Sequence, residues 1–177
     1  MGLDIHRHAD DALFRPGFGR AELAQGLTTI VNGNCGLSLA PVPAARRPEI
    51  YGYLTPVTGL PAEELPTQTM QAYLDAVGAA VLPLNVGMLV GGGTVRAAAA
   101  GFSPEPLDSG ALHAVHRLIE QSLSGGALGV SLGLGYAPEI FYTTQQLIDA
   151  LAPLRESGVP VTVHMRQEGG GVAESVR

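Results

Sequence analysis

The sequence predicts an α/β fold in which a parallel sheet is covered by helices on both faces. Apolar, β-leaning runs alternate with helical patterns, as expected for strands joined by crossover helices. Hydrophobic residues make up 46% and charged residues 15%, which indicates a packed interior and excludes a disordered chain. The 24 glycines and 13 prolines are spread along the chain, which is typical of short elements joined by tight loops. The length of 177 residues fits one domain, residues 1–177.

The predicted strands are five apolar runs that each end at a polar or glycine-rich loop. They span residues 2–6, 28–31, 84–90, 127–132 and 159–164. Such nearly continuous apolar runs are typical of parallel strands that are buried on both faces.

Helical patterns lie between several of these strands. They cover residues 67–80, 107–123 and about 144–157. In the second, Leu112, Val115 and Ile119 recur at helical spacing, and the third begins at the capping residue Thr143 or Thr144. Residues 41–66 interrupt the alternation, and their proline and glycine content predicts a long loop packed on the domain.

Charge and cysteine content exclude several classes of partner and location. Ten basic residues, all arginine, stand against 16 acidic ones, and the net charge of -6 offers no basic face for nucleic acid or an anionic membrane. A single cysteine cannot form a disulfide framework. The sequence also has no apolar run of membrane-spanning length and no signal-peptide layout at its start, so we expect a cytoplasmic protein.

Two histidines stand at the end of the first predicted strand, in the stretch DIHRHAD. Residues i and i+2 of an extended segment point to the same side, so His6 and His8 can place two imidazoles on one metal ion. Taken alone, such a pair is equally consistent with two surface histidines.

Cys35 follows the second predicted strand, in the stretch NGNCG. An accessible thiolate between glycines is a ligand for zinc, whereas a buried thiol would be inert. His164 ends the fifth predicted strand. Because all parallel strands end at the same edge of the sheet, we expect His6, His8, Cys35 and His164 to converge there on a metal ion.

Two other features are weaker candidates. His113 and His116 have the i, i+3 spacing of a metal pair, but a solvated helix face explains them better. The segment around the glycines at 91–93 lacks the lysine of a phosphate-binding loop. These glycines indicate a tight strand-to-helix turn or a place where the backbone closely approaches a ligand.

A family resemblance is carried by five segments: GLDIHRHAD, GLTTIVNGNCGLSLAP, PLNVGMLVGGGTVR, GALGVSLGLGYAPEIFYTT and VTVHMRQEG. Together they resemble the N-acyl-D-amino-acid deacylase (D-aminoacylase) family of the amidohydrolase superfamily. The resemblance implies the N-terminal part, about five strands, of a metal-dependent (β/α)8 TIM-type barrel that stops before closure. It also implies that the family's N-terminal β-rich segment and the C-terminal half of its barrel are absent from this sequence.

The resemblance also implies roles for individual residues. His6 and His8 match ligands of a second, weaker metal site, and Cys35 and His164 match ligands of a tightly bound Zn²⁺. Arg166 and Tyr136 match positions near the substrate. The implied reaction is hydrolysis of the amide bond of a small-molecule N-acyl-D-amino acid, which releases the D-amino acid and a carboxylate. This branch uses cysteine where other amidohydrolases use a carboxylated lysine, and the chain contains no lysine.

The sequence departs from the family pattern in ways that affect function. The family's catalytic Asp and a further metal-binding histidine lie beyond Arg177, so this chain holds no catalytic residue of its own, and we expect little or no turnover from it. Gly92 stands where related sequences commonly carry histidine. Open barrel edges expose apolar strands, so we expect self-association or a complementary chain. Two alternatives are a non-catalytic metal-binding or interaction module and an acyl hydrolase with Cys35 as nucleophile.

Overall fold

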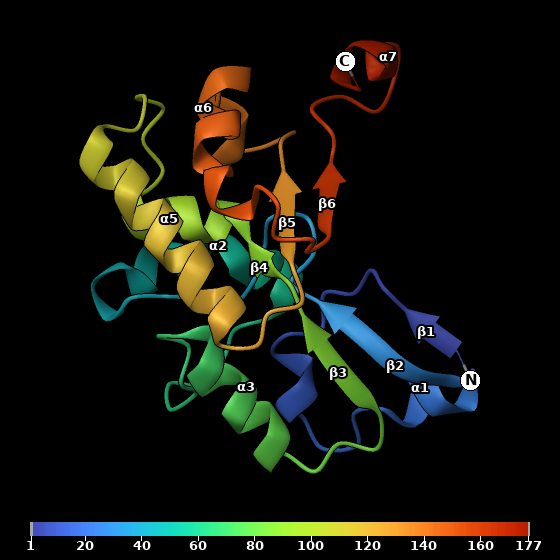
Figure 1. Ribbon diagram of the computed structural model, residues 1–177. Helices are drawn as coiled ribbons and strands as arrows, with labels where there is room; N and C mark the ends of the chain where they lie inside the picture. The colour runs from blue at the N-terminus through green and yellow to red at the C-terminus, as the bar shows by residue number, and fades with distance from the viewer. Residues whose placement is uncertain (1, 177) are drawn as a thin grey trace.

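Parallel strands form the framework of the structure, a computed structural model that describes residues 2–176 (Figure 1). The strands are β1 (Gly2–Asp4), β2 (Leu27–Asn32), β3 (Asn85–Met88), β4 (Val90–Gly91), β5 (Val130–Gly133) and β6 (Val161–His164). They form two three-stranded sheets in the orders β1-β2-β3 and β4-β5-β6. Every pairing is parallel, which confirms the α/β class, and the described strands do not close into a barrel.

The expected third strand, residues 84–90, is divided at Leu89 into β3 and β4, so six short strands replace the five expected. β3 pairs with β2, whereas β4 pairs with β5 on the other side. The N–H of Leu89 still bonds the Asn32 carbonyl at 2.9 Å, and the N–H of Val90 bonds the Gly129 carbonyl at 3.0 Å. The backbone at Leu89 and Val90 therefore changes from bonding with β2 to bonding with the residue before β5. This switch separates the sheet β1-β2-β3 from the sheet β4-β5-β6.

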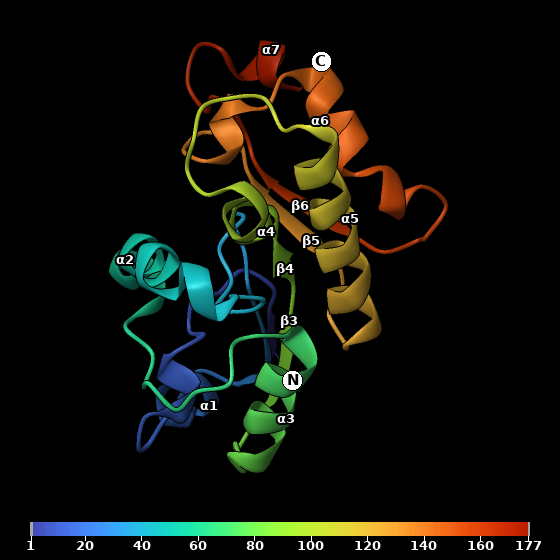
Figure 2. The ribbon, with the colours of Figure 1, turned by 90° about the vertical axis from the view of Figure 1, so that its left-hand side faces the viewer.

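Helices connect the strands, and the long ones stand along one side of them (Figures 1 and 2). They are α1 (Arg20–Ala24), α2 (Arg47–Thr58), α3 (Met70–Ala79), α4 (Gly92–Ala100), α5 (Ser109–Ser124), α6 (Thr144–Ala150) and α7 (Val172–Ser175). The main core lies between these helices and the strands, around fully buried side chains such as Ile30, Tyr73 and Met88. Among residues 2–176, no helix is long and apolar enough to cross a membrane.

The expectation that helices cover the strands on both faces is wrong for the two edge strands. The side chains of Leu3 on β1 and of Val161 and Val163 on β6 are 60%, 41% and 48% exposed. β1 pairs only with β2, and β6 pairs only with β5. Within residues 2–176, these apolar positions therefore have no covering layer.

The long loop expected at residues 41–66 contains a helix, α2, preceded by the short 3-10 helix η2 (Ala44–Arg46). Ile50, Tyr51 and Leu54 recur at helical spacing on one buried face of α2. Pro48 lies in the first turn, where its missing N–H costs no hydrogen bond. Pro56 lies inside the helix, near its end, where it leaves the carbonyl four residues earlier without its helical N–H partner, so the segment forms a helix in spite of this proline.

The other predicted helices are present, and each begins at a side-chain cap, of which only the one at Thr143 was expected. The side chain of Thr69 accepts from the N–H of Ala72 at the start of α3, and that of Asp108 accepts from the N–H of Ala111 at the start of α5. Thr143 caps α6 in a capping box with Gln146. α6 ends at Ala150, short of the expected residue 157, and gives way to the 3-10 helix η4 (Ala152–Leu154), which contains Pro153.

Candidate metal centre

Three of the predicted metal ligands lie together at the ends of β1 and β2. Nε2 of His6 is 3.1 Å from Sγ of Cys35, and the ring centroids of His6 and His8 are 5.5 Å apart. One ligand atom from each of the three residues lies within 4.8 Å of the others. Two imidazole nitrogens and one thiol sulfur form a donor set that suits zinc.

The protonation of these groups is consistent with a metal site. Burial, and then the neighbouring His6, lowers the pKa of His8, which favours the neutral imidazole that binds metals. Nδ1 of His8 is buried without a hydrogen-bond partner among the described residues. Burial raises the pKa of the Cys35 thiol against the opposing effect of Tyr136, and Glu168 adds to the rise, so a nearby cation would favour the thiolate. These residues therefore fit a bound zinc ion.

A sharp turn carries Cys35. Its φ of 56° is in the left-handed region, and the flanking Gly33 and Gly36 have φ of 76° and 72°. The N–H of Gly36 donates to the side chain of Ser131 on β5 at 2.9 Å, and the hydroxyl of Tyr136 donates to the carbonyl of Cys35. Residues about a hundred positions further along the chain thus hold the turn in place.

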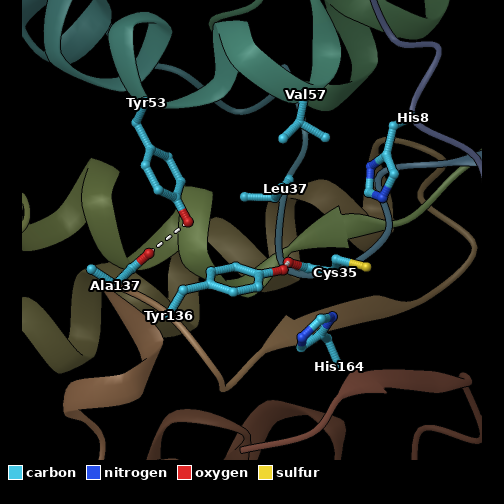
Figure 3. Close-up of a pocket in the computed structure, with 8 residues that line it drawn as sticks. All are labelled: His8, Cys35, Leu37, Tyr53, Val57, Tyr136, Ala137 and His164. Atoms are coloured by element: carbon cyan, nitrogen blue, oxygen red, sulfur yellow. Dashed lines mark hydrogen bonds between the residues drawn. The ribbon is translucent and has the colours of Figure 1, made fainter. Parts of the chain in front are cut away.

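His164 lies on the wall of the same pocket, outside the three-residue cluster. The pocket has a volume of about 580 Å³, and His8, Cys35, Tyr136 and His164 line it together with apolar side chains (Figure 3). The rings of Tyr136 and His164 are 5.1 Å apart, and Nε2 of His164 lies 3.7 Å from a carboxylate oxygen of Glu168. The convergence of all four ligands on one ion stays a prediction.

The two residues expected near a substrate differ in their placement. Tyr136 lines the pocket, and its ring points toward Cys35 (Figure 3). Arg166 follows β6, is half-buried, and does not line the pocket. Its side chain makes no hydrogen bond or ion pair with residues 2–176.

The features that we considered weaker candidates have structural roles. His116 on α5 donates from Nε2 to the backbone carbonyl of Asp149 at 2.7 Å, and its ring lies 6.4 Å from that of His113. Gly91 ends β4, and a Cβ there would lie 2.5 Å from the carbonyl oxygen of Gly36. The glycines at 91–93 thus allow the backbone that follows Cys35 to pack closely against the start of α4.

Sequence reasoning did not single out several residues of this region. Tyr53 and Val57 reach the pocket from α2, which we had expected to be a loop. Asp10 and Glu139 are fully buried acids, and burial raises their pKa values to about 7 and about 8 against the opposing effect of nearby backbone N–H groups. Asp10 belongs to the stretch DIHRHAD, but its burial depends on tertiary packing that the sequence pattern does not reveal.

Comparisons with known proteins place this parallel α/β chain among relatives of D-aminoacylase. The chain is 34% identical over 167 residues to the D-aminoacylase of Alcaligenes xylosoxydans xylosoxydans, an alignment that covers 94% of this chain and 34% of that protein. It is 31% identical over 175 residues to the N-acyl-D-aspartate deacylase of the same organism, and that alignment covers 98% of this chain and 34% of the relative. No protein-family model matches the chain.

Solved structures agree with this result. The N-acyl-D-glutamate deacylase of Bordetella bronchiseptica, complexed with zinc and a phosphonate mimic of the tetrahedral intermediate, superposes with a TM-score of 0.85 and 31% identity. That match covers 98% of this chain and 35% of the other. A D-aminoacylase that defines a subset of amidohydrolases gives a TM-score of 0.83 and 30% identity, and the match covers 98% of this chain and 36% of that one. Another study of D-aminoacylase concerns its binuclear metal centre.

These comparisons confirm the resemblance. The chain is related to the D-aminoacylase and N-acyl-D-amino-acid deacylase family, and it spans about a third of the length of the relatives that it matches.

Proposed function

We propose that this protein takes part in the zinc-dependent hydrolysis of N-acyl-D-amino acids, which releases the D-amino acid and a carboxylate. The observation that carries the proposal is the cluster of His6, His8 and Cys35 at the ends of two parallel strands. Relatives with the same fold are named as deacylases of N-acyl-D-amino acids, and one of them is solved with zinc. Both the fold and the donor atoms therefore favour this chemistry.

We assign His6, His8, Cys35 and His164 as the metal ligands. Cys35 and His164 belong to a tightly bound zinc, and His6 and His8 belong to a second, weaker site. Zinc supplies Lewis-acid polarisation of an amide carbonyl and an activated water when it is bound. The chain itself contributes a soft sulfur ligand and neutral imidazoles at one edge of the sheet.

The substrate would occupy the pocket beside these ligands. Tyr53 donates its hydroxyl hydrogen to the carbonyl of Ala137, and Tyr136 donates to the carbonyl of Cys35. Both phenols are thereby fixed, so their rings form rigid walls that orient the substrate. Arg166 would attract the substrate carboxylate from outside the pocket wall. Leu37 and Val57 form the apolar side of the pocket.

Turnover by these 177 residues alone is expected to be weak or absent. The buried carboxyls of Asp10 and Glu139 do not line the pocket, so neither is placed to shuttle protons there. General acid–base catalysis contributes about 10²- to 10⁴-fold to rates, and its absence would leave a metal-binding chain with little activity. A non-catalytic metal-binding module is therefore the first alternative.

The second alternative is an acyl hydrolase in which Cys35 is the nucleophile. The distance of 3.1 Å from His6 Nε2 to Cys35 Sγ favours it, because a histidine at this distance can take the thiol proton. The raised pKa of the Cys35 thiol opposes it. A chelator separates the two chemistries, since a cysteine nucleophile needs no metal.

The test is metal analysis of the purified chain by inductively coupled plasma mass spectrometry, with Cys35→Ala and the control His113→Ala. We expect about one zinc per chain, lost in Cys35→Ala and retained in His113→Ala. Folded protein without zinc would contradict the metal site. Hydrolysis of N-acetyl-D-amino acids that survives complete removal of metal would favour the cysteine nucleophile instead.

We further propose that the two exposed apolar edges of the sheets are covered by a second copy of the chain or by a complementary chain. One edge is β1 with Leu3 and the following Ile5, and the other is β6 with Val161 and Val163. These four side chains are between 41% and 62% exposed. Edge strands that present apolar side chains and unpaired backbone groups are prone to pairing with another chain. We also propose a cytoplasmic location, in keeping with a single, unpaired cysteine.

A further inference from the structure

Glu139 is a buried acid that none of the proposed chemistry uses. It is the first residue of the 3-10 helix η3 (Glu139–Phe141) and is 1% exposed. Its Oε2 accepts a hydrogen bond from the N–H of Gly133, at the end of β5, at 2.7 Å. Its Oε1 is buried without a hydrogen-bond partner among the described residues. The carboxyl group thus lies inside the protein, close to the ends of the strands.

The carboxyl group fills space that two glycines leave open. A Cβ on Gly92, at the start of α4, would collide with Oε1 of Glu139 and lie 2.9 Å from the side chain of Leu132. A Cβ on Gly36 would collide with Oε2 of Glu139 and lie 2.7 Å from the backbone nitrogen of Gly133. The carboxyl group is therefore wedged between the start of α4, the end of β5 and the turn that carries Cys35.

Hydrogen bonds connect this wedge to the candidate metal centre. The carbonyl of Gly36, which directly follows Cys35, accepts from the N–H of Thr94 on α4 at 3.1 Å. The carbonyl of Tyr136 accepts from the N–H of Ile140, the neighbour of Glu139, at 2.9 Å, and the hydroxyl of Tyr136 donates to the carbonyl of Cys35. The turn that carries Cys35 is therefore hydrogen-bonded both to α4 and to Tyr136, and the carboxyl group of Glu139 packs between these segments.

We infer that Glu139 is a positioning residue of the metal centre, which fixes the turn that carries Cys35 and for which Gly92 and Gly36 provide the space. Only its effect on zinc affinity rests on the proposed function. Its effect on the geometry of the turn does not, because Cys35 is the single cysteine of the chain and reports on its own environment.

The first test measures the rate at which iodoacetamide alkylates Cys35 in metal-free protein at one fixed pH. Glu139→Ala is compared with the near-isosteric Glu139→Gln, which keeps an oxygen to accept from the N–H of Gly133. Val77→Ala on α3 serves as a control for general loss of stability, since Val77 is buried and does not line the pocket. We expect Glu139→Ala to react several-fold faster than wild type, while the other two variants react at the wild-type rate.

The second test asks whether Glu139 and Gly92 share one space. Gly92→Ala is made in the wild type and in Glu139→Ala. We expect Gly92→Ala to change the alkylation rate several-fold in the wild type and to have little further effect in Glu139→Ala, where the collision with the carboxyl group is gone and only a terminal methyl group of Leu132 has to shift. Equal effects of Gly92→Ala in both backgrounds would contradict the inference that the carboxyl group of Glu139 occupies the space beside Gly92.

Zinc affinity completes the experiment. Loss of a residue that orients a metal ligand typically weakens binding by about 10- to 100-fold, so we expect Glu139→Ala to bind zinc at least about tenfold more weakly, with Glu139→Gln close to wild type. Wild-type alkylation in Glu139→Ala, or equal acceleration in Val77→Ala, would overturn the inference. If the wild type bound no zinc while the alkylation pattern held, the proposed metal function would fail and the positioning role of Glu139 would stand.

Discussion

The side chain of Ser131, on β5, accepts a hydrogen bond from the backbone N–H of Gly36 at 2.9 Å, although the two residues are 95 positions apart. The same hydroxyl donates to the carbonyl of Gly33. Ser131 is fully buried, so one small side chain bridges both ends of the turn that carries Cys35. The candidate metal centre thus depends on β5 as well as on the strands that supply its ligands.

Substitution Ser131→Ala is expected to lower the free energy of unfolding by about 1–3 kcal/mol, because it leaves the N–H of Gly36 and the carbonyl of Gly33 buried without this partner. Chemical denaturation measures the effect. Ser103→Ala, at a position outside the buried set, is the matched control and should change stability by less than about 0.5 kcal/mol. Equal stability of Ser131→Ala and wild type would show that the turn does not need β5.

Gly33→Ala is expected to destabilise the protein by more than about 2 kcal/mol. Gly33 has a φ of 76°, and a Cβ there would collide with the backbone carbonyl oxygen of Leu89, which cannot move like a side chain. Gly52→Ala on α2 is the opposite case, because no atom lies within 4 Å of its added Cβ. That variant should gain roughly 0.5–1 kcal/mol, and thermal melts of the two variants should shift in opposite directions.

The parts of the site that the sequence predicts follow from local rules. The i, i+2 spacing places His6 and His8 on one side of an extended segment, and parallel strands that end at one edge bring Cys35 close to them. These rules need no knowledge of packing, so the three-residue cluster could be predicted. His164 was assigned to the same edge, and it does line the pocket.

Other features depend on tertiary contacts that no local pattern reveals. The buried face of α2 exists because Tyr51 and Leu54 pack on the core, and the prolines of that segment concealed the helical spacing. The division of the third strand depends on which neighbour each backbone group meets on either side of Leu89. Glu139 reads as an ordinary surface acid, and only the close approach of three glycine-containing segments buries it.

His164→Ala tests whether the fourth predicted ligand takes part in metal binding. The residue lies on the pocket wall with Cys35 but outside the cluster within 4.8 Å. If a zinc ion draws its ring into coordination, the variant should bind zinc at least about tenfold more weakly in a competition titration with a chelating dye. The control is His116→Ala, because the ring of His116 is hydrogen-bonded to the carbonyl of Asp149. This variant should bind zinc like the wild type. Equal affinity of the two variants would remove His164 from the site.

Self-association is expected through the exposed apolar edges, β1 and β6. Light scattering coupled to size exclusion should give a mass above the 18.3 kDa of one chain, and Val163→Glu should reduce that mass. Leu60→Glu is the control, since Leu60 is 63% exposed but follows α2 and belongs to no strand. A monodisperse monomer with a cooperative melt would contradict the proposal that these edges need a covering chain.

The pH dependence of stability should carry a signature of Glu139. Burial raises the pKa of this acid to about 8 from 4.5, although the N–H groups of Gly133 and Gly93 and the charge of Arg96 act in the opposite direction. Between these values the folded protein keeps a proton that the unfolded chain releases, so this contribution to stability is present at low pH and is lost as the pH rises toward 8.

The expected loss is at most about 1.4 kcal/mol per pH unit, and Glu139→Gln removes it because the amide does not ionise. Asp10, with a pKa raised to about 7, adds a slope of the same sign in both proteins, so it cancels from the difference between them. Urea denaturation of both proteins at several pH values should therefore give similar stabilities near pH 5 and an increasing advantage of Glu139→Gln toward pH 8. Parallel curves would mean that Glu139 titrates alike in the folded and unfolded states, and the carboxyl group would then have to be in contact with water.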